Sequence, residues 1–307
     1  MNKAFHLTTF GESHGIALGG VIEGCPSGLK IDIQLIKDDL ARRATGKTSS
    51  ESQRRESDEV EFLSGLLDGV TLGTPIAFLV RNTDARPEDY EAIKGTFRPS
   101  HADYTYQAKY GIRDWRGGGR ASARAMLPYV VAGAIAKQIL AERGIRISAV
   151  VRSIGGETDP SKITALLERC RAEGDTVGGI VHGSITGLPA GLGEPLDDKF
   201  QACLAKAMFT IPAVKGFEYG DGFAMASMRG SEANDLMAVN DEGSMQFLSN
   251  HSGGIQGGIT NGEEVFFNVA FKPIPTLGLG DRHDVCALPR ATVIVEAMAA
   301  LVVMAML

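Results

Sequence analysis

The last part of the chain is the feature that most constrains its fold. Residues 293–307 are apolar except for Glu296. This stretch is too short to span a bilayer, which needs about 20 apolar residues. A helix that is apolar all round must be covered on every side. We therefore expect residues 289–307 to form a helix buried in the core or in a subunit interface, with no role in a membrane.

Weaker patterns place the other elements of the fold. Helical patterns cover residues 32–43, 128–143, 162–172 and 196–207. Strand patterns cover residues 19–23, 72–81, 176–185 and 265–271. Asp32 is a plausible N-cap, and Gly144 directly follows the second helix. Because strands and helices do not alternate strictly, we expect an α+β fold, a β-α-β layered sandwich, and not a doubly wound parallel sheet. No linker composition divides the chain, so residues 1–307 are expected to form a single domain.

Charge and cysteine content limit the class of protein. The formal net charge of -6 argues against nucleic acid as the main partner. The N-terminus shows no secretory signal pattern. The four cysteines form no CxxC pair, which favours reduced cytosolic thiols and no structural zinc. We therefore expect a cytoplasmic protein without a metal site.

Two groups of cationic side chains stand out on this acidic chain. One consists of Arg98, His101, Arg113, Arg116, Arg120 and Arg124; the other is RHD at residues 282–284. Guanidinium groups bind oxyanions through a fixed fork of donors. Any single arginine is most simply a solvated surface residue. The set indicates a pocket for a small, multiply anionic molecule.

The motif GESHG at residues 11–15 can present a histidine into a cleft. Glycines flank this short polar run, which precedes an apolar strand. Imidazole suits general acid or base catalysis because its pKa lies near neutrality. On its own His14 would be read as a surface-loop histidine, which is the interpretation we give His6 and His182.

Three further glycine or proline motifs suit ligand binding. GGG at residues 117–119 lets the backbone approach a ligand, and the helix that follows could bind phosphate through its N–H groups. HSGGIQGG at residues 251–258 can leave room for a flat ring or a backbone crossing. KPIPT at residues 272–276 is a stiff extended segment with a lysine and a hydroxyl. A glycine-rich turn between packed elements explains the glycines but not the arginines around them.

Two familiar nucleotide motifs are absent from the sequence. GKT at residues 46–48 resembles the end of a P-loop, but Ala41 occupies the place of its leading glycine. No GxGxxG fingerprint follows a strand. The adjacent Asp197 and Asp198 are explained by the N-terminus of a helix, where the dipole favours carboxylates.

The motifs together resemble the chorismate synthase family. They are GESHG, HADYTYQAKYGIRDWRGGGRASAR at residues 101–124, IPAVKG at 211–216, HSGGIQGG, KPIPT and RHDVCALPRA at 282–291. Their order and spacing cover almost the whole chain. The resemblance implies a β-α-β sandwich, a homotetramer and the 1,4-anti elimination of phosphate from 5-enolpyruvylshikimate 3-phosphate. It also implies a requirement for reduced FMN without net redox change. The two carboxylates and one phosphate of this substrate would fit the surplus of arginines.

The resemblance also implies a role for each matching residue. His14 would be the acid near the departing phosphate, His101 would protonate or hydrogen-bond the flavin near N1, and Asp284 would assist proton removal with flavin N5. The substrate-binding residues would be Arg43, Arg98, Arg124 and Arg282. The FMN-binding residues would be Arg120, Ala121, Ser122, Pro212, Ala213, Gly257, Lys272, Pro273, Ile274, Pro275, Thr276 and Arg282. Pro212 stands where the family often has Gln or Asn.

The sequence departs from the family pattern at three places. Ser49 replaces a second clamp arginine, with Lys47 the nearest cation; residues 277–281 form a shorter loop than usual; and Met126-Leu127-Pro128 replaces a polar pair. Since proline is tolerated in a first helical turn, we expect only local change there.

Two alternatives to a flavin-dependent lyase stay open from the sequence. One is a flavin oxidoreductase that consumes NAD(P)H, which the missing nucleotide fingerprint disfavours. The other is a non-catalytic relative that only binds flavin or a phosphorylated ligand, which the intact His14, His101 and Asp284 disfavour. The sequence does not decide whether NADPH reduces the flavin on this protein.

Overall fold

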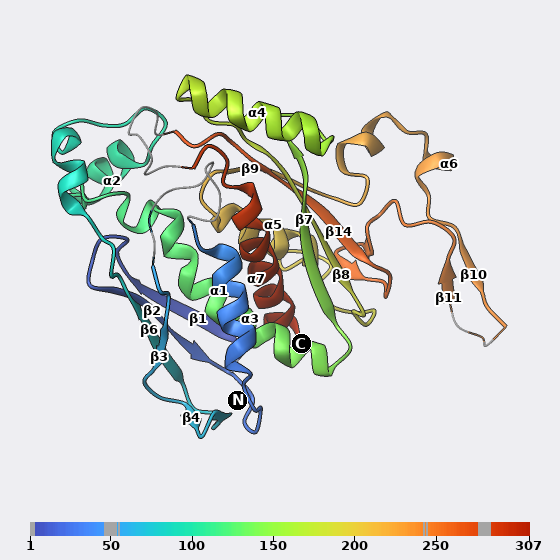
Figure 1. The fold of residues 1–307 in the computed structure, drawn as a ribbon. Helices are drawn as coiled ribbons and strands as arrows, with labels where there is room; N and C mark the ends of the chain where they lie inside the picture. Colours follow the sequence, from blue (N-terminus) through green and yellow to red (C-terminus); the bar gives the residue numbers. More distant parts are fainter. Residues whose placement is uncertain (1–3, 46–53, 55, 242, 244, 276–283) are drawn as a thin grey trace.

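The protein is layered as sheet, helices and sheet (Figure 1). The computed structural model describes residues 4–45, 54, 56–241, 243, 245–275 and 284–307. Long helices lie between two four-stranded sheets, and their apolar side chains meet the inner face of each sheet. The expected β-α-β layered sandwich is confirmed by this order of layers.

The first sheet has the strand order β1-β2-β6-β3, with every neighbouring pair antiparallel. Its strands are β1 (His6–Gly11), β2 (Ala17–Glu23), β6 (Ile76–Arg81) and β3 (Val60–Phe62). On β6 the buried residues alternate as Ile76, Phe78 and Val80, which is the pattern of a strand with one face on the core. The loop from β1 to β2 carries the GESHG motif to the edge of the helical layer.

The second sheet has the order β7-β8-β14-β9, also antiparallel. Its strands are β7 (Arg146–Ile154), β8 (Gly179–Thr186), β14 (Val265–Phe271) and β9 (Val214–Tyr219). The ring of Phe267 on β14 packs over Gly183 on β8, where a Cβ atom would lie 2.3 Å from the ring. Val265, Phe267, Val269 and Phe271 of β14 are buried and point to the same face of the sheet.

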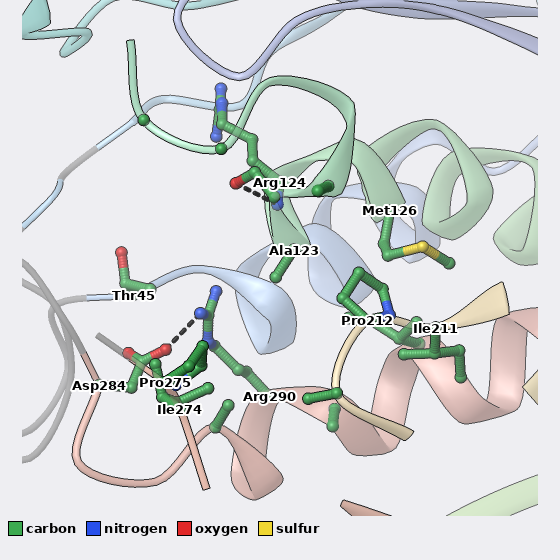
Figure 2. Close-up of a pocket in the computed structure, with 18 of the residues that line it drawn as sticks. Thr45, Ala123, Arg124, Met126, Ile211, Pro212, Ile274, Pro275, Asp284 and Arg290 are labelled. Carbon is green, nitrogen blue, oxygen red and sulfur yellow. Dashed lines mark hydrogen bonds and ion pairs between the residues drawn. The ribbon is translucent and has the colours of Figure 1, made fainter. Parts of the chain in front are cut away.

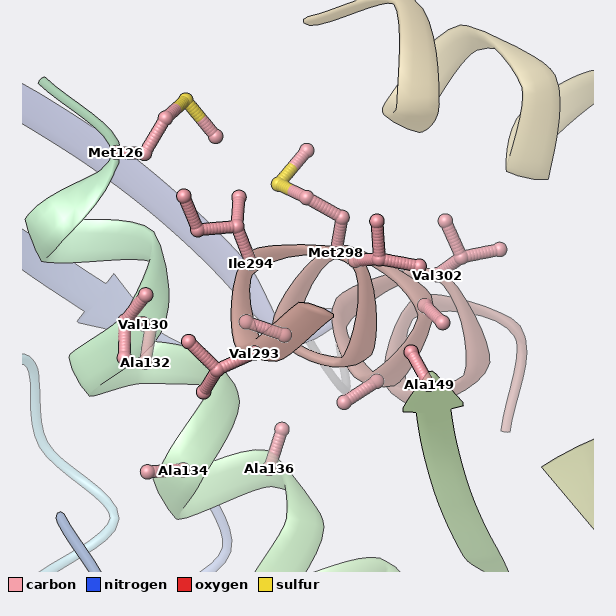
Figure 3. Packing of buried hydrophobic residues seen from close by; sticks show 14 of the residues in the cluster. Met126, Val130, Ala132, Ala134, Ala136, Ala149, Val293, Ile294, Met298 and Val302 are labelled. Carbon is pink, nitrogen blue, oxygen red and sulfur yellow. The ribbon is translucent and has the colours of Figure 1, made fainter. Parts of the chain in front are cut away.

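Four helices fill the middle layer (Figure 1). They are α1 (Ile33–Arg43), α3 (Leu127–Glu142), α5 (Phe200–Thr210) and α7 (Leu288–Met306). The segments Ala123–Glu142 and Leu288–Met306 are long and apolar enough to cross a membrane, but 72% of each lies buried inside the protein. Both are therefore helices of the protein's core. Figure 3 shows α3 and α7 crossing, with Val130 and Val293 among the side chains between them.

Shorter elements lie outside these three layers. The remaining strands are β4 (Leu66–Leu67), β5 (Val70–Thr71), β10 (Met237–Val239), β11 (Met245–Phe247), β12 (Ile255–Gln256) and β13 (Ile259–Thr260). The remaining α-helices are α2 (Asp103–Tyr110), α4 (Pro160–Glu173) and α6 (Gly230–Ala233). Short 3-10 turns cover Pro87–Ile93, Gly119–Ala121, Ala123–Met126 and Gly222–Ser227.

Several sequence predictions of local structure are confirmed. Asp32 caps α1 by accepting a hydrogen bond from the backbone N–H of Gln34 at 2.8 Å. Pro128 lies in the first turn of α3, so the unusual residues there leave the helix intact. Gly144 follows α3 with a φ of 76°.

Other local predictions are wrong in their bounds. The helix predicted from residue 196 begins at Phe200 with Lys199 as its N-cap, so Asp197 and Asp198 lie directly before the helix N-terminus and not in its first turn. The strand predicted from residue 72 begins at Ile76, because Gly73 adopts a left-handed φ of 78° before Pro75. The strand predicted at residues 176–185 is Gly179–Thr186. His182 lies on that strand and hydrogen-bonds Asn268, so it is not a loop residue.

Gly133 sets the closest approach of α3 and α7. A Cβ atom at this position would lie 2.4 Å from Cβ of Ala297 and 2.5 Å from its Cα. We expect Gly133→Ala to lower the free energy of unfolding by about 1–3 kcal/mol through overpacking, although alanine has the better helix propensity by about 1 kcal/mol. Urea unfolding measures the change.

Gly230→Ala is the matched control for this prediction. Gly230 also lies in a helix, and a Cβ atom there would meet nothing within 4 Å. We expect this variant to be no less stable than the parent protein. If both glycine substitutions change stability equally, close packing is not the reason for Gly133.

Candidate active site

Segments from distant parts of the chain surround a cavity of about 510 Å³ at one end of the helical layer. This volume lies within the range of about 300–1,000 Å³ typical of small-molecule sites. Figure 2 shows Arg124 and Met126 facing it from one side, Ile211 and Pro212 from another, and Asp284 with Arg290 from a third. The sequence motifs that were separate along the chain therefore share one pocket.

His14 reaches this cavity from the loop between β1 and β2. Its side chain is 8% exposed, and Nδ1 lies 3.1 Å from the hydroxyl of the fully buried Ser13. The ring packs edge-on against Tyr90 at 5.0 Å between centroids. A Cβ atom at Gly117, which has a φ of 71°, would lie 2.4 Å from the imidazole. The first of the three glycines is thus required by the close approach of His14.

His101 is held in a turn that Arg98 and Asp103 build together. Arg98 binds both carboxylate oxygens of Asp103, at 2.8 and 2.9 Å, and also donates to the carbonyl oxygen of Gly117 at 2.7 Å. Nδ1 of His101 lies 3.0 Å from Asp103, although the two groups are not aligned as a hydrogen bond. Three of the five N–H groups of Arg98 are thus used inside the protein.

The pKa values of His101 and Asp103 in this turn are both lower than usual. Burial, together with the charge of Arg98, lowers the pKa of His101. Burial acts to raise the pKa of Asp103, but hydrogen bonds from Arg98 outweigh it and lower that pKa to about 2. Asp103 is therefore ionised and the free imidazole of His101 is neutral at pH 7.

Arg43 and Arg124 place two guanidinium groups at the cavity wall. Arg43 ends α1 and is 4% exposed; Arg124 lies before α3 and is 6% exposed. Both donate to the buried carboxylate of Asp58, and Arg124 also donates to Asn82 at 2.6 Å. Among the described residues, Nε of Arg43 and Nη2 of Arg124 find no hydrogen-bond partner. Buried donors without partners are costly, and these two belong to residues that line the cavity.

The loop at residues 117–124 is tied to the first sheet by Arg120. Its guanidinium donates to the hydroxyl of Thr9 at 2.6 Å and to the carbonyl oxygen of Gly11 at 3.2 Å. Ser122 caps the next turn by accepting from the backbone N–H of Arg124. Arg120, Ala121 and Ser122 all line the cavity, as predicted.

Asp284 lies just before α7 and pairs with Arg290 in its first turn. The carboxylate is 4% exposed, and Nε of Arg290 has no hydrogen-bond partner among the described residues. Both side chains line the cavity, in the view of Figure 2.

Backbone strain is concentrated around the cavity. Four described residues other than glycine have a positive φ, and three of them, Asp58, Ser100 and Ala213, line the pocket. Lys272 ties two of these places together, because its Nζ donates to Ser100 and its backbone N–H donates to Ala213, both at 2.9 Å. Such conformations persist where surrounding structure holds them, and they cluster at functional sites.

Not every predicted site residue lies at this cavity. Those that line it are His14, Arg43, Arg98, His101, Arg120, Ala121, Ser122, Arg124, Pro212, Ala213, Lys272, Ile274, Pro275 and Asp284. Gly257, in the turn between β12 and β13, and Pro273 are not among its lining residues. Thr276 and Arg282, like Lys47, Ser49 and residues 277–281, fall outside the described part of the chain.

The cationic groups of the sequence do not all converge. Arg113 donates to the carbonyl oxygens of Lys94 and Thr96 and pairs with Asp103, so it supports the turn from behind. Arg116 pairs with Asp114. Neither is among the residues that line the cavity.

Several lining residues were missed by reasoning from the sequence. They are Arg54, Glu56, Asp58, Tyr90, Tyr106, Met126 and Arg290. The cluster of charges over residues 54–58 and the arginine of the final motif were visible signals, but ordinary surface charge explains such residues equally well. Only the folded chain shows that they face the same pocket.

The fold and the pocket define an enzyme for a small, multiply anionic substrate, because buried arginines surround paired imidazole and carboxylate groups. The family model of chorismate synthase matches residues 5–307. The chain therefore belongs to the chorismate synthase family.

Individual relatives agree with this assignment. A chorismate synthase from Porphyromonas gingivalis is 49% identical over 339 residues, covering 97% of this chain and 92% of that protein. One from Christiangramia forsetii is 51% identical, covering 98% and 94%. A crystal structure of chorismate synthase has a TM-score of 0.82 at 30% identity, covering 100% of this chain and 92% of the other. The first alignment is longer than the 307 residues here, so the relative has segments that this chain lacks.

Family membership establishes the reaction. The protein is a carbon–oxygen lyase that eliminates phosphate from 5-enolpyruvylshikimate 3-phosphate and forms chorismate, in aromatic amino acid biosynthesis. The family requires reduced FMN.

Proposed function

We propose that His14, His101 and Asp284 carry out the proton transfers and hydrogen bonding of this elimination. The observation that carries the proposal is their position on one cavity, although they are widely separated in the sequence. His14 acts as the acid near the departing phosphate, where negative charge builds in the transition state. Its contact with Ser13 and its packing against Gly117 hold the ring in one orientation.

His101 acts as a hydrogen-bonding group more readily than as a permanent cation. Burial and Arg98 lower its pKa, so the free protein holds it neutral at pH 7. A neutral imidazole both donates and accepts a hydrogen bond. An anion bound beside it would favour its protonation, which would make the second role, proton donation, available in the loaded enzyme.

Asp284 assists proton removal from the substrate in this proposal. Its side chain lines the cavity and pairs with Arg290. The same pair fixes the direction of the carboxylate relative to α7.

Arg43, Arg98 and Arg124 hold the anionic groups of the substrate, together with Arg282. The position of Arg43 and Arg124 at the cavity wall supports this role. Arg98 uses its Nε and Nη2 donors within the turn of His101, so only its Nη1 group is left to meet a ligand. A substrate with two carboxylates and one phosphate would compensate these charges.

The cavity also fits the reduced flavin that the family requires. Ile211, Pro212, Ile274 and Pro275 offer apolar surface to a flat ring, and Met126 adds to it (Figure 2). Arg120, Ser122 and Lys272 offer cationic and hydroxyl groups for its phosphate and polyol chain. When bound, reduced FMN supplies the electron density that the substrate needs as phosphate leaves. The chain's part is to exclude water from the ring and to place His101 beside it.

We further propose that residues 1–307 act as one domain in a cytoplasmic homotetramer. A single buried apolar cluster runs from Phe5 to Met304, which supports one domain. Ile16, Ile112 and Phe223 are each at least 76% exposed, and exposed apolar side chains of this size are typical of contact surfaces when they gather in patches. Light scattering of the purified protein measures the mass of the assembly.

One anaerobic assay tests the proposed function. Purified protein, chemically reduced FMN and 5-enolpyruvylshikimate 3-phosphate should give chorismate and inorganic phosphate in equal amounts. Oxidised FMN without reductant should give neither. A protein that oxidises NADPH without substrate but forms no chorismate would be a flavin oxidoreductase, and this result would contradict the proposal.

Substrate binding should weaken with salt. A clamp of several arginines attracts a trianion, and the screening length falls from about 10 Å at 0.1 M ionic strength to about 3 Å at 1 M. We expect KM to rise several-fold between low and high potassium chloride, with kcat much less affected. An unchanged KM would count against a site built on many arginines. Thermal unfolding at each salt concentration controls for loss of structure.

A further inference from the structure

Asp58 lies between the two arginines that end at the cavity wall. One oxygen of its carboxylate accepts from Nη2 of Arg43, and the other accepts from Nη1 of Arg124 at 3.0 Å. The side chains of all three residues are at most 6% exposed. The resemblance to the family assigned no role to this carboxylate.

The backbone holds Asp58 in place from a second direction. Its φ is 49°, a left-handed conformation that is uncommon for residues other than glycine. Two residues earlier, the carboxylate of Glu56 accepts from the backbone N–H and the hydroxyl of Thr83, both at 2.7 Å. Glu56 also pairs with Arg54. The segment that carries Asp58 is thus anchored to the loop after β6.

The electrostatics of the three groups explain why a carboxylate is needed here. Burial, with the charges of Arg43 and Arg54, lowers the pKa of Arg124 to about 10, and Asp58 acts in the opposite direction. Burial acts to raise the pKa of Asp58, but Arg43 and Arg124 outweigh it and keep it low. Without Asp58, two buried cations would face each other with no anion between them, and the flexible side chains would move apart.

We propose that Asp58 is a positioning residue, which fixes Arg43 and Arg124 at the spacing that the substrate's anionic groups require. This inference rests on the proposed substrate role of the two arginines. Each arginine gives Asp58 one N–H group and keeps other donors. Among the described residues, Nε of Arg43 and Nη2 of Arg124 have no hydrogen-bond partner, although Nη2 of Arg124 also lies 3.7 Å from the carboxylate of Glu56. Asp58 thus orients the pair without consuming its capacity to bind oxyanions.

The proposal predicts a result opposite in sign to simple charge attraction. Asp58 is an anion close to a site for a trianion, so its neutralisation should by Coulomb's law strengthen substrate binding. If Asp58 positions the arginines, its neutralisation should weaken binding instead. The direction of the change in KM therefore separates the two cases.

The experiment measures kcat and KM for 5-enolpyruvylshikimate 3-phosphate, with reduced FMN, in Asp58→Asn and in a matched control. We expect Asp58→Asn to raise KM at least tenfold. Asp68→Asn is the control, because Asp68 has the same φ of 49° but lies outside the cavity lining; it should leave both constants unchanged. A KM equal to or below the parent value in Asp58→Asn would overturn the proposal.

A second variant keeps the test decisive if Asp58→Asn does not fold, as judged by circular dichroism. Asp58→Glu keeps the charge but moves the carboxylate by one methylene group. Positioning predicts a raised KM for this variant as well, whereas a role in charge alone predicts the parent value, which would overturn the proposal.

Arg124→Met separates failure of this inference from failure of the proposed function. If Arg124→Met keeps the parent KM, the arginine clamp itself is wrong. If Arg124→Met raises KM but Asp58→Asn does not, only the role of Asp58 is wrong. In the double variant Arg124→Met with Asp58→Asn, the two losses in kcat/KM should be less than additive, because Asp58 acts through Arg124.

Discussion

Replacing His14 or His101 by alanine should lower kcat by about 10²–10⁴-fold, the usual contribution of a positioned acid or base. Each imidazole lines the cavity and is held by specific neighbours: Ser13 and Tyr90 for His14, and the turn of Arg98 for His101. Turnover is measured anaerobically as chorismate formed with chemically reduced FMN.

Folding must be unchanged for this result to bear on catalysis. His6→Ala is the control, because His6 is exposed on β1 and lies outside the cavity lining. It should keep the parent rate. Thermal unfolding of all three variants checks that the protein stays folded. If both His14→Ala and His101→Ala turn over at nearly the parent rate, the proposed roles of the two histidines are wrong.

Glu296→Gln should destabilise the protein by about 1.5–3 kcal/mol, the usual contribution of hydrogen bonds to charged groups, while Asp39 continues to pair with Arg42 and Lys137. Glu296 is 4% exposed in the otherwise apolar α7. It accepts from both Nη1 and Nη2 of Arg42, at 2.7 and 2.6 Å, and from Lys137 at 2.9 Å. It also accepts from the backbone N–H of Ala149 on β7. One carboxylate therefore joins three helices and a strand, and urea unfolding at a fixed protein concentration measures its loss.

The contribution of Glu296 to stability should also depend on pH. Burial acts to raise the pKa of Glu296, but Arg42 and Lys137 outweigh it and lower the pKa below the ordinary 4.5. A carboxyl group with a lowered pKa in the folded state contributes stability above its unfolded pKa, and the contribution is lost as pH falls through the folded pKa. The stability difference between the parent protein and Glu296→Gln should therefore shrink below about pH 4.5.

Glu61→Gln is the matched control for Glu296→Gln. Glu61 pairs with Arg81 at 2.7 Å, a distance similar to that of the buried pair, but both side chains are largely exposed. Exposed pairs contribute little because water screens them. Equal effects of the two substitutions would show that burial does not decide the strength of the Glu296 network.

The elements that could be predicted from sequence are those with a strong local signal. The apolar run at residues 293–307 predicted a buried helix, and the structure confirms it as part of α7. The strand at Val265–Phe271 and the N-cap at Asp32 were also confirmed. The strand Arg146–Ile154 was missed, because the polar residues within it weaken the strand pattern. It takes its place in the sheet from pairing with β8.

The site was predictable as a set of motifs but not as an arrangement. His14, His101 and Asp284 were marked by glycines, arginines and a family pattern. Asp58 and Arg290 were not, because their partners are identified only by contact: Asp58 and Arg124 are 66 residues apart in the sequence. The same limit hid the use of Arg98, most of whose donors bind Asp103 and Gly117 inside the protein.

The sequence by itself determined the family, the chemistry of the substrate and the burial of the final helix. These three properties follow from the types of residue in the chain and from their order. Residue types and their order are the same in the folded and the unfolded chain. Only the tertiary structure decided which arginines keep donors for a ligand, which carboxylate orients them and where Gly133 lets two helices meet. Those properties depend on distances between atoms of remote segments, and these distances exist only after the two sheets have closed over the helices between them.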